Sequence, residues 1–220
     1  MDRKYFVITA PKIDGVTATT EKRGFKLTFH GELDKTWPWS SASPITSDGF
    51  MLTAKHSIKP ALADSRSKPW VIEFNRGHPR ALAAAVVWTG TNSDLALLKV
   101  KAETCNFFEW SHPHGKLKRG TVAVQGGLKS HMASGKLRSE ALLDKPELES
   151  VVIPHSLRSR HGDSGAPLID EEGRLIGIIT RRIYFEFGSE REVLGGGEAL
   201  RPNVDLINNL IEQYRRSGGR

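Results

Sequence analysis

The chain has 220 residues, of which 38% are hydrophobic and 26% are charged, and its formal net charge is +7. A chain of this length and balance can bury a sizeable core, as one large domain or two small ones. No apolar run approaches the roughly 18 residues that a membrane-spanning helix needs, which excludes a helical membrane protein.

The N-terminal apolar patch is short. Tyr5–Ala10 is too brief for the core of a signal peptide, and we interpret it as a first strand. We therefore expect a cytoplasmic protein, or a fragment from which a targeting segment has been removed. Cys105 is the only cysteine, so no internal disulfide can form, and this fits a reducing compartment.

Short apolar runs separated by turn residues follow one another through most of the chain. Ser47-Asp48-Gly49, for example, is typical of a hairpin turn. Many short strands in series predict a barrel or a sandwich. After the first strand, we expect strands at residues 25–29, 50–54, 70–74, 84–88, 95–100, 121–124, 150–153, 167–169 and 175–180.

Two segments depart from the strand pattern. Ser57–Ala63 predicts a short helical turn. Asn203–Tyr214 places its apolar residues on one face, and Pro202-Asn203 is a helix start signal, so we expect an amphipathic helix over about residues 203–215. His112–Gly115 is the best candidate for a connection between two halves of the chain.

Basic residues occur in scattered clusters and form no dense run. Such clusters are either a solvated surface, which the scatter favours, or a site for nucleic acid or an acidic partner. The clusters are Lys116–Arg119, Arg158–His161, Arg181–Arg182 and Arg215–Arg216.

Gly162-Asp163-Ser164-Gly165 has the residue types of a nucleophile loop. A serine hydroxyl is a poor nucleophile near neutral pH and needs a neighbouring base. The oxyanion formed by its attack needs two convergent backbone N–H donors, which glycine helps to aim because it tolerates positive φ. Gly162 and Ser164 are therefore candidates for an oxyanion hole, and a glycine-rich turn without chemistry is the alternative.

Two further polar residues adjoin strand-like runs. His56 follows Leu52–Lys55, and Asp94 comes immediately before Leu95–Leu98. With Ser164 they supply a base, an orienting carboxylate and a nucleophile, in that chain order. Taken singly, each has a structural alternative: an exposed or core histidine, a capping carboxylate and a turn serine.

Four segments resemble trypsin-like serine peptidases of the chymotrypsin fold, nearest the compact bacterial HtrA and glutamyl endopeptidase kinds. SASPITSDGFMLTAKHSIK resembles the histidine block, and SDLALLKVK resembles the acid block. HGDSGAPLIDEEGRLIGIIT resembles the nucleophile block with the strand pair after it. GGGEALRPNVDLINNLIEQY resembles the closing strand and helix of the HtrA peptidase domain.

The resemblance implies an all-β fold of two six-stranded antiparallel barrels with a C-terminal helix, and a site in the cleft between the barrels. It implies that residues 1–110 form a barrel carrying His56 and Asp94, and that residues 111–220 form a barrel carrying Ser164. The implied function is a serine endopeptidase that forms a covalent acyl-enzyme. A protease-like fold that binds without cutting is the alternative, and a binder of nucleic acid or an anionic partner is a third class.

The chain departs from the family at its ends. Members activated by N-terminal cleavage begin with an Ile-Val-Gly-Gly-like motif, whose amine pairs with the aspartate before the serine. This N-terminus has no such motif, so we expect Asp163 to pair with Arg158 or Arg160, or its loop to order on binding. No PDZ-like segment follows the helix, so we expect this chain to lack HtrA's peptide-sensing module, and a regulatory partner or further domain stays open.

In the family, the residue six positions before the nucleophile often lies at the base of the substrate pocket, and here it is Arg158. By resemblance, Thr180 supports the catalytic aspartate, and Arg181 and Arg182 lie on the pocket wall. These cations suggest a preference for an acidic residue before the cut, by charge complementarity. The family's glutamyl-specific histidine is replaced here by Ile179.

The alternative is that these arginines point to solvent or pair with Glu186, Glu190 or Asp163.

Other kinds of site chemistry have weaker support in the sequence. His112-Pro113-His114 lacks a nearby acid or cysteine to complete a metal site, and Ser164 already fills the nucleophile role that Cys105 could take. We expect a polypeptide substrate, no metal or cofactor, no membrane contact and no nucleic acid.

Overall fold

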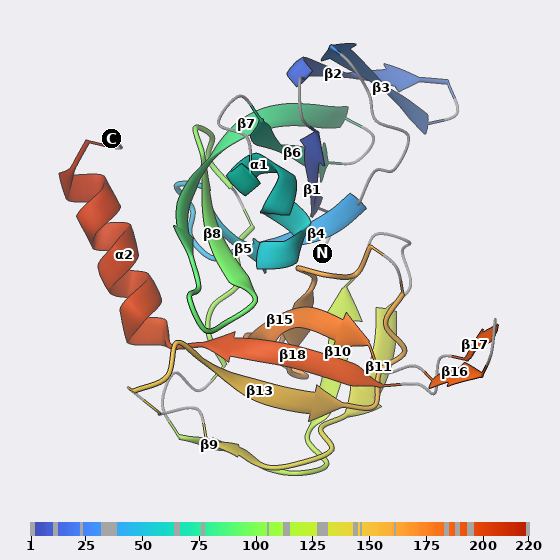
Figure 1. The fold of residues 1–220 in the computed structure, drawn as a ribbon, viewed down its shortest axis with the longest axis vertical. Helices are drawn as coiled ribbons and strands as arrows, with labels where there is room; N and C mark the ends of the chain where they lie inside the picture. The colour runs from blue at the N-terminus through green and yellow to red at the C-terminus, as the bar shows by residue number, and fades with distance from the viewer. Residues whose placement is uncertain are drawn as a thin grey trace.

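The structure is a computed structural model of the 220-residue chain, shown in Figure 1. It describes residues 3–10, 13–22, 24–31, 39–63, 67–75, 78–104, 106–111, 115–126, 132–142, 145, 147–160, 162–182, 185–187, 190–192 and 196–218. No helix within these ranges is both long and apolar enough to cross a membrane.

Six strands from the first half of the chain close into an antiparallel barrel in the order β1-β4-β5-β8-β7-β6. Their alternating or wholly apolar runs bury one common interior, as the sequence predicts for a barrel. The strands are β1 (Arg3–Ala10), β4 (Trp39–Pro44), β5 (Phe50–Ala54), β6 (Lys68–Asn75), β7 (His78–Thr89) and β8 (Leu95–Val100).

A separate hairpin, β2 (Ile13–Glu21) and β3 (Gly24–Gly31), lies beside this barrel at the top of Figure 1. It packs Val16, Leu27 and Phe29 against the buried Ile72 of β6. A short turn η1 (Lys55–Ile58) and helix α1 (Lys59–Ala63) follow β5, where the sequence predicts a helical turn.

Six strands from the second half form a curled antiparallel sheet in the order β11-β10-β14-β15-β18-β13. Its two edge strands, β11 and β13, approach each other where Leu137, just beyond β11, forms an isolated antiparallel β-bridge with His155. The strands are β10 (Val122–Gly126), β11 (Met132–Lys136), β13 (Ser150–His155), β14 (Pro167–Ile169), β15 (Leu175–Arg182) and β18 (Gly197–Pro202). The two sheets confirm the expected two-barrel chymotrypsin-like fold.

Two small ladders decorate the second barrel. They are β9 (Lys116–Leu117) with β12 (Ala141–Leu142), and β16 (Phe185–Phe187) with β17 (Glu190–Glu192). The segment proposed to connect the halves lies mainly outside the described residues, because only Gly115 of His112–Gly115 is described.

Helix α2 (Val204–Arg216) confirms the predicted amphipathic helix. The Asn203 side chain accepts a hydrogen bond from the Leu206 amide at 3.0 Å, which caps the first turn. At the other end, Arg215 pairs with Asp48 at 3.0 Å, so the last helical turn is tied to the first barrel. Figure 1 shows the helix running alongside that barrel.

One apolar cluster joins the two barrels and the helix. Removing these side chains from water stabilises the relative position of the barrels by roughly 25 cal/mol per Å² of apolar surface. Because His56 and Asp94 belong to the first half of the chain and Ser164 to the second, this cluster also fixes their relative positions. Its buried members are Ile45, Phe50, Leu52, Leu95, Leu97, Phe108, Leu175, Ile178, Leu200, Ile207 and Ile211.

Candidate active site

The position of His56 follows from a fully buried strand. Every side chain of β5 is buried, and this strand runs directly into η1, which carries His56. Strand β5 pairs with β8, with Ala54 opposite Leu95. The Lys55 amide then donates to the Asp94 carbonyl at 3.1 Å, so the end of one strand lies against the start of the other.

The structure brings together the three residues that the sequence proposes as catalytic. The His56 ring atom Nδ1 lies 2.7 Å from Asp94 Oδ2, and the His56 main-chain N–H donates to Asp94 Oδ1 at 2.9 Å. On the other side of the ring, Nε2 lies 3.0 Å from Ser164 Oγ. The imidazole therefore lies between a carboxylate and a hydroxyl, at hydrogen-bond distance from each.

Solvent reaches these groups unequally. The His56 side chain is 47% exposed, whereas the Asp94 side chain is 25% exposed. The carboxylate is thus partly shielded and holds the ring through Oδ2 and the His56 backbone through Oδ1, while the ring keeps an open face. This arrangement can fix one tautomer of the imidazole and aim Nε2 at the serine.

The Ser164 loop contains a turn that requires glycine. The Asp163 amide donates to the Arg160 carbonyl at 3.1 Å, which closes a four-residue turn in which Gly162 has a φ of 97°. A glycine with positive φ in the third position is typical of a type II turn. Within the described part of the chain, the amide N–H groups of Gly162 and Ser164 have no hydrogen-bond acceptor.

Asp163 is bound by one of the two expected residues, but through that residue's backbone. Its carboxylate is buried and accepts a hydrogen bond from the main-chain N–H of Arg160 at 2.6 Å. Arg160 was one of the two expected partners, but it contributes its backbone and not its guanidinium. The side chains of Arg158 and Arg160 are both exposed.

Sequence reasoning missed two serines that hold the Ser164 loop. Strand β4 reads WSSASP, and its polar letters gave no strand signal. Ser41 Oγ donates to the Gly162 carbonyl at 3.0 Å, and Ser43 Oγ donates to the Gly165 carbonyl at 2.9 Å. The Ser41 amide also donates to the Ser164 carbonyl at 2.7 Å. The available signal was the resemblance of the segment that begins at Ser41 to the family's histidine block.

Glu149 is a second residue that sequence reasoning missed. Its carboxylate accepts hydrogen bonds from the main-chain N–H groups of Thr91 and Asn92, at 3.0 and 2.8 Å. These two residues belong to the loop that leads into Asp94. A carboxylate from the second half of the chain therefore holds the loop before Asp94, which belongs to the first half. Nothing in the sequence near Glu149 signals this contact.

Residues predicted for the substrate pocket contact Glu198 and Gly197. The Thr180 hydroxyl donates to the Glu198 carbonyl at 3.4 Å, so its described bond is not to Asp94. Arg181 is 73% exposed and lies 3.8 Å from the Glu198 carboxylate. The backbone of Arg182 pairs with Gly197, and its side chain lies outside the described residues. Cys105 and His112–His114 also lie outside them.

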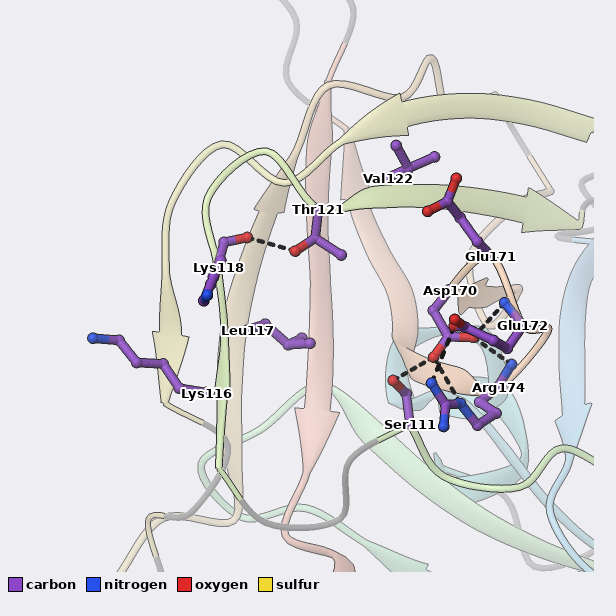
Figure 2. A pocket seen from close by; sticks show the side chains of 10 residues that line it. All are labelled: Ser111, Lys116, Leu117, Lys118, Thr121, Val122, Asp170, Glu171, Glu172 and Arg174. Atoms are coloured by element: carbon purple, nitrogen blue, oxygen red, sulfur yellow. Dashed lines mark hydrogen bonds and ion pairs between the residues drawn. The ribbon is translucent and has the colours of Figure 1, made fainter.

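A polar pocket of about 310 Å³ lies beside Asp170, on the second barrel (Figure 2). Ser111 Oγ donates to Asp170 Oδ2 at 2.6 Å, and Arg174 Nε donates to the same oxygen at 3.0 Å. Burial raises the pKa of Asp170, but these hydrogen bonds and the Arg174 charge outweigh burial and leave its pKa below the ordinary value. The pocket is a satisfied structural network.

Two relatives align with much of the chain but are longer proteins. The uncharacterized protein y4bJ of Sinorhizobium fredii is 31% identical over 144 residues, which are 63% of this chain and 21% of that protein. A protein named protease Do-like 14, from Arabidopsis thaliana, is 22% identical over 188 residues, which are 81% of this chain and 41% of that protein. The chain thus spans less than half the length of either relative.

Solved structures share the fold at low identity. An HtrA-type protease, AlgW, with a decapeptide has a TM-score of 0.61 at 20% identity, covering 96% of this chain and 64% of its own. A serine endoprotease from Yersinia pestis has a TM-score of 0.58 at 20% identity, covering 97% and 63%. At the level of sequence, a family model described as a trypsin-like peptidase domain matches residues 41–178, more than half of the chain. The chain therefore belongs to the family of trypsin-like peptidases.

Proposed function

We propose that the chain is a serine endopeptidase that uses Ser164 as nucleophile, His56 as base and Asp94 as the orienting carboxylate. The proposal is supported above all by one geometric relationship. The His56 ring lies 2.7 Å from Asp94 through Nδ1 and 3.0 Å from Ser164 through Nε2. Family membership and fold support the broader assignment to the serine proteases.

Acylation begins when Ser164 Oγ bonds to the carbonyl carbon of the peptide and its proton passes to His56 Nε2. Asp94 Oδ2 accepts the Nδ1–H and stabilises the imidazolium. The carbonyl oxygen becomes an oxyanion, which accepts hydrogen bonds from the Gly162 and Ser164 amides. The imidazolium then protonates the departing amine as the C–N bond breaks, which leaves an ester on Ser164.

Deacylation repeats these transfers with water. A water molecule gives a proton to His56 and its oxygen bonds to the ester carbon. As the second tetrahedral intermediate collapses, the C–O bond to Ser164 breaks and His56 returns the proton to Oγ. The products are a carboxylic acid, an amine and the original enzyme.

The chemistry is tested by hydrolysis of an unfolded protein substrate and of fluorogenic peptides. We expect cleavage by the wild-type protein and a loss of at least about 10³-fold in kcat for Ser164→Ala and for His56→Ala. Circular dichroism of each variant checks that the fold is kept. Equal rates for the wild type and Ser164→Ala would instead indicate a binding module on the protease fold.

The finer proposal is a preference for an acidic residue before the cut. Its support is that Arg158 and Arg181 are both exposed, and that Arg181 meets its carboxylate neighbour only at 3.8 Å. A loosely paired guanidinium can pair with a substrate carboxylate at little cost.

Peptides that differ only in Glu, Ala or Lys before the cut test this preference. We expect kcat/KM to be highest for Glu, and Arg181→Gln to reduce that advantage about fivefold. Arg216→Gln removes the same charge from the exposed C-terminal end of α2 and should leave the profile unchanged. A preference for Lys or for Ala in the wild-type protein would contradict the proposal.

A further inference from the structure

A groove of about 510 Å³ lies on the second barrel where its two edge strands meet. It is lined by the loop Arg119-Gly120, by Lys136–Arg138 at the end of β11, and by Ser156, which follows β13. The groove shares no described lining residue with the pocket beside Asp170 or with the His56, Asp94 and Ser164 site.

The backbone of the groove is held by a set of hydrogen bonds. The Ser156 amide donates to the Lys136 carbonyl at 3.0 Å, and the Lys136 amide donates to Ser156 Oγ at 2.9 Å. The Gly120 amide donates to the Leu137 carbonyl at 2.9 Å, in a turn where Gly120 has a φ of 84°. The side chains that line the groove therefore extend from a fixed frame, which reduces the ordering cost of binding.

The charge of the groove is of one sign. Arg119, Lys136 and Arg138 are all exposed, and no carboxylate is among the described residues that line the groove. The pocket in Figure 2 differs, because the carboxylates of Asp170, Glu171 and Glu172 are among the side chains that line it. Since Arg174 already pairs with Asp170 and Glu172, an anionic ligand has less to gain there.

Burial and the charge of the groove together lower the pKa of a histidine beside it. His155 has no solvent exposure, and its pKa is lowered to about 4, first by burial and then by the charge of Arg138. Neither ring nitrogen has a hydrogen-bond partner in the part of the chain that the structure describes. The positive charge of Arg138 is thus felt inside the barrel, at the ring of His155.

The groove adjoins parts of the chain that lead to the proposed catalytic serine. Ser156 begins the segment that ends at Ser164, and a Cβ built on Gly196 would lie 3.0 Å from Arg138 Nη2. Gly197, the next residue, pairs with Arg182 at the end of β15. A polypeptide bound near the end of β15 is therefore within reach of the groove.

We propose that this groove binds an acidic segment of the polypeptide substrate, remote from the bond that is cut. This inference rests on the proposed peptidase function. Carboxylates match the three cations and the Ser156 hydroxyl, whereas no aromatic side chain lines the groove among the described residues to stack nucleic-acid bases.

Binding is measured on Ser164→Ala protein, so that the result does not depend on catalysis. The probe is a fluorescein-labelled peptide rich in glutamate, compared by anisotropy with the same peptide carrying glutamine. We expect the glutamate peptide to bind more tightly, and the added pair Arg119→Gln and Lys136→Gln to weaken it about fivefold. Lys22→Gln with Lys26→Gln removes the same charge from the distant β2–β3 hairpin and should have no effect.

Kinetics then test the link to substrate. In the otherwise wild-type enzyme, an acidic extension on a fluorogenic peptide should lower KM about threefold to fivefold with kcat unchanged, and the Arg119 and Lys136 double variant should lose this gain. Equal affinity for the glutamate and glutamine peptides would overturn the inference. It would also be overturned if DNA but not the peptide bound through these residues, or if the extension left KM unchanged.

Discussion

The hydroxyl of Ser41 donates a hydrogen bond to the carbonyl oxygen of Gly162 at 3.0 Å. Ser41 belongs to β4 of the first barrel, and Gly162 belongs to the loop of Ser164 in the second barrel. The same strand donates its Ser41 amide to the Ser164 carbonyl at 2.7 Å. The first barrel thus supplies His56 and Asp94 and also holds the backbone that carries the serine.

Replacing Ser41 by alanine should lower kcat by about tenfold with little change in KM. The buried Gly162 carbonyl would lose its donor, and the adjoining peptide groups would be free to rotate away from the position that a developing oxyanion needs. Steady-state kinetics on one fluorogenic peptide measure both constants. Ser41→Thr keeps the hydroxyl and should recover part of the rate.

Ser40→Ala is the matched control for this experiment. Ser40 is buried in the same strand, but no described hydrogen bond joins its hydroxyl to the nucleophile loop. If Ser40→Ala and Ser41→Ala reduced kcat equally, the loss would come from strand packing and not from the bond to Gly162.

Glu149→Gln should reduce kcat/KM several-fold. The Glu149 carboxylate accepts the Thr91 and Asn92 amides, and a glutamine has one acceptor oxygen where the carboxylate has two. The loop before Asp94 would then be less well ordered, and Asp94 would hold the His56 ring less firmly. Unfolding in urea should show a loss of about 1 kcal/mol, and an unchanged kcat/KM would argue against any role of this loop in positioning Asp94.

His155 should make the fold sensitive to mild acid. Its folded pKa of about 4 lies below its ordinary value of 6.5, so between these values the unfolded chain binds more protons than the folded one. Stability contributed by the neutral ring is present above pH 6.5 and is lost as the pH falls toward 4. From pH 7 to pH 5 this linkage amounts to about 2 kcal/mol.

Urea unfolding of wild type and His155→Phe at the two pH values tests this linkage. The variant keeps a buried ring but cannot be protonated, so its stability should fall less between pH 7 and pH 5. His30→Gln removes an exposed imidazole and should behave like the wild type. An identical pH dependence for wild type and His155→Phe would contradict the assignment.

Ile207→Ala should destabilise the whole molecule by about 2–5 kcal/mol, because it opens a cavity in the cluster shared by both barrels and α2. Ile207 has no solvent exposure. Denaturant unfolding followed by tryptophan fluorescence and by circular dichroism measures the loss. Leu62→Ala, at a position of α1 that is 44% exposed, should cost much less.

Local patterns were sufficient to predict the strands that build the core. Strands β5, β8 and β14 have the predicted bounds, because their short apolar runs are flanked by turn or charged residues. The helix was predicted with its start within one residue, because Asn203 is both a sequence signal and an actual cap.

Other elements depend on contacts that no local pattern records. Strand β4 is rich in serine, and it is buried because its hydroxyls bond to the carbonyls of the Ser164 loop, more than 100 residues away. Glu149 likewise acts across the two halves of the chain. The polar groups that hold the site were therefore missed, whereas the three residues proposed for catalysis follow from their motifs.

The pocket arginines show the same limit. Charge and family position put Arg158 and Arg181 near a substrate, but the side-chain directions depend on tertiary contacts. The structure leaves Arg158 exposed and brings Arg181 toward Glu198. Acidic preference therefore stays a prediction.

The most direct measurement for the central claim is the intact mass of the protein after reaction with a fluorophosphonate, which phosphonylates a serine only when a neighbouring base activates it. We predict a single adduct on Ser164 in the wild-type protein, none on Ser164→Ala, and strongly slowed labelling of His56→Ala. A wild-type protein that keeps its unmodified mass, or an adduct that persists in Ser164→Ala, would contradict the account.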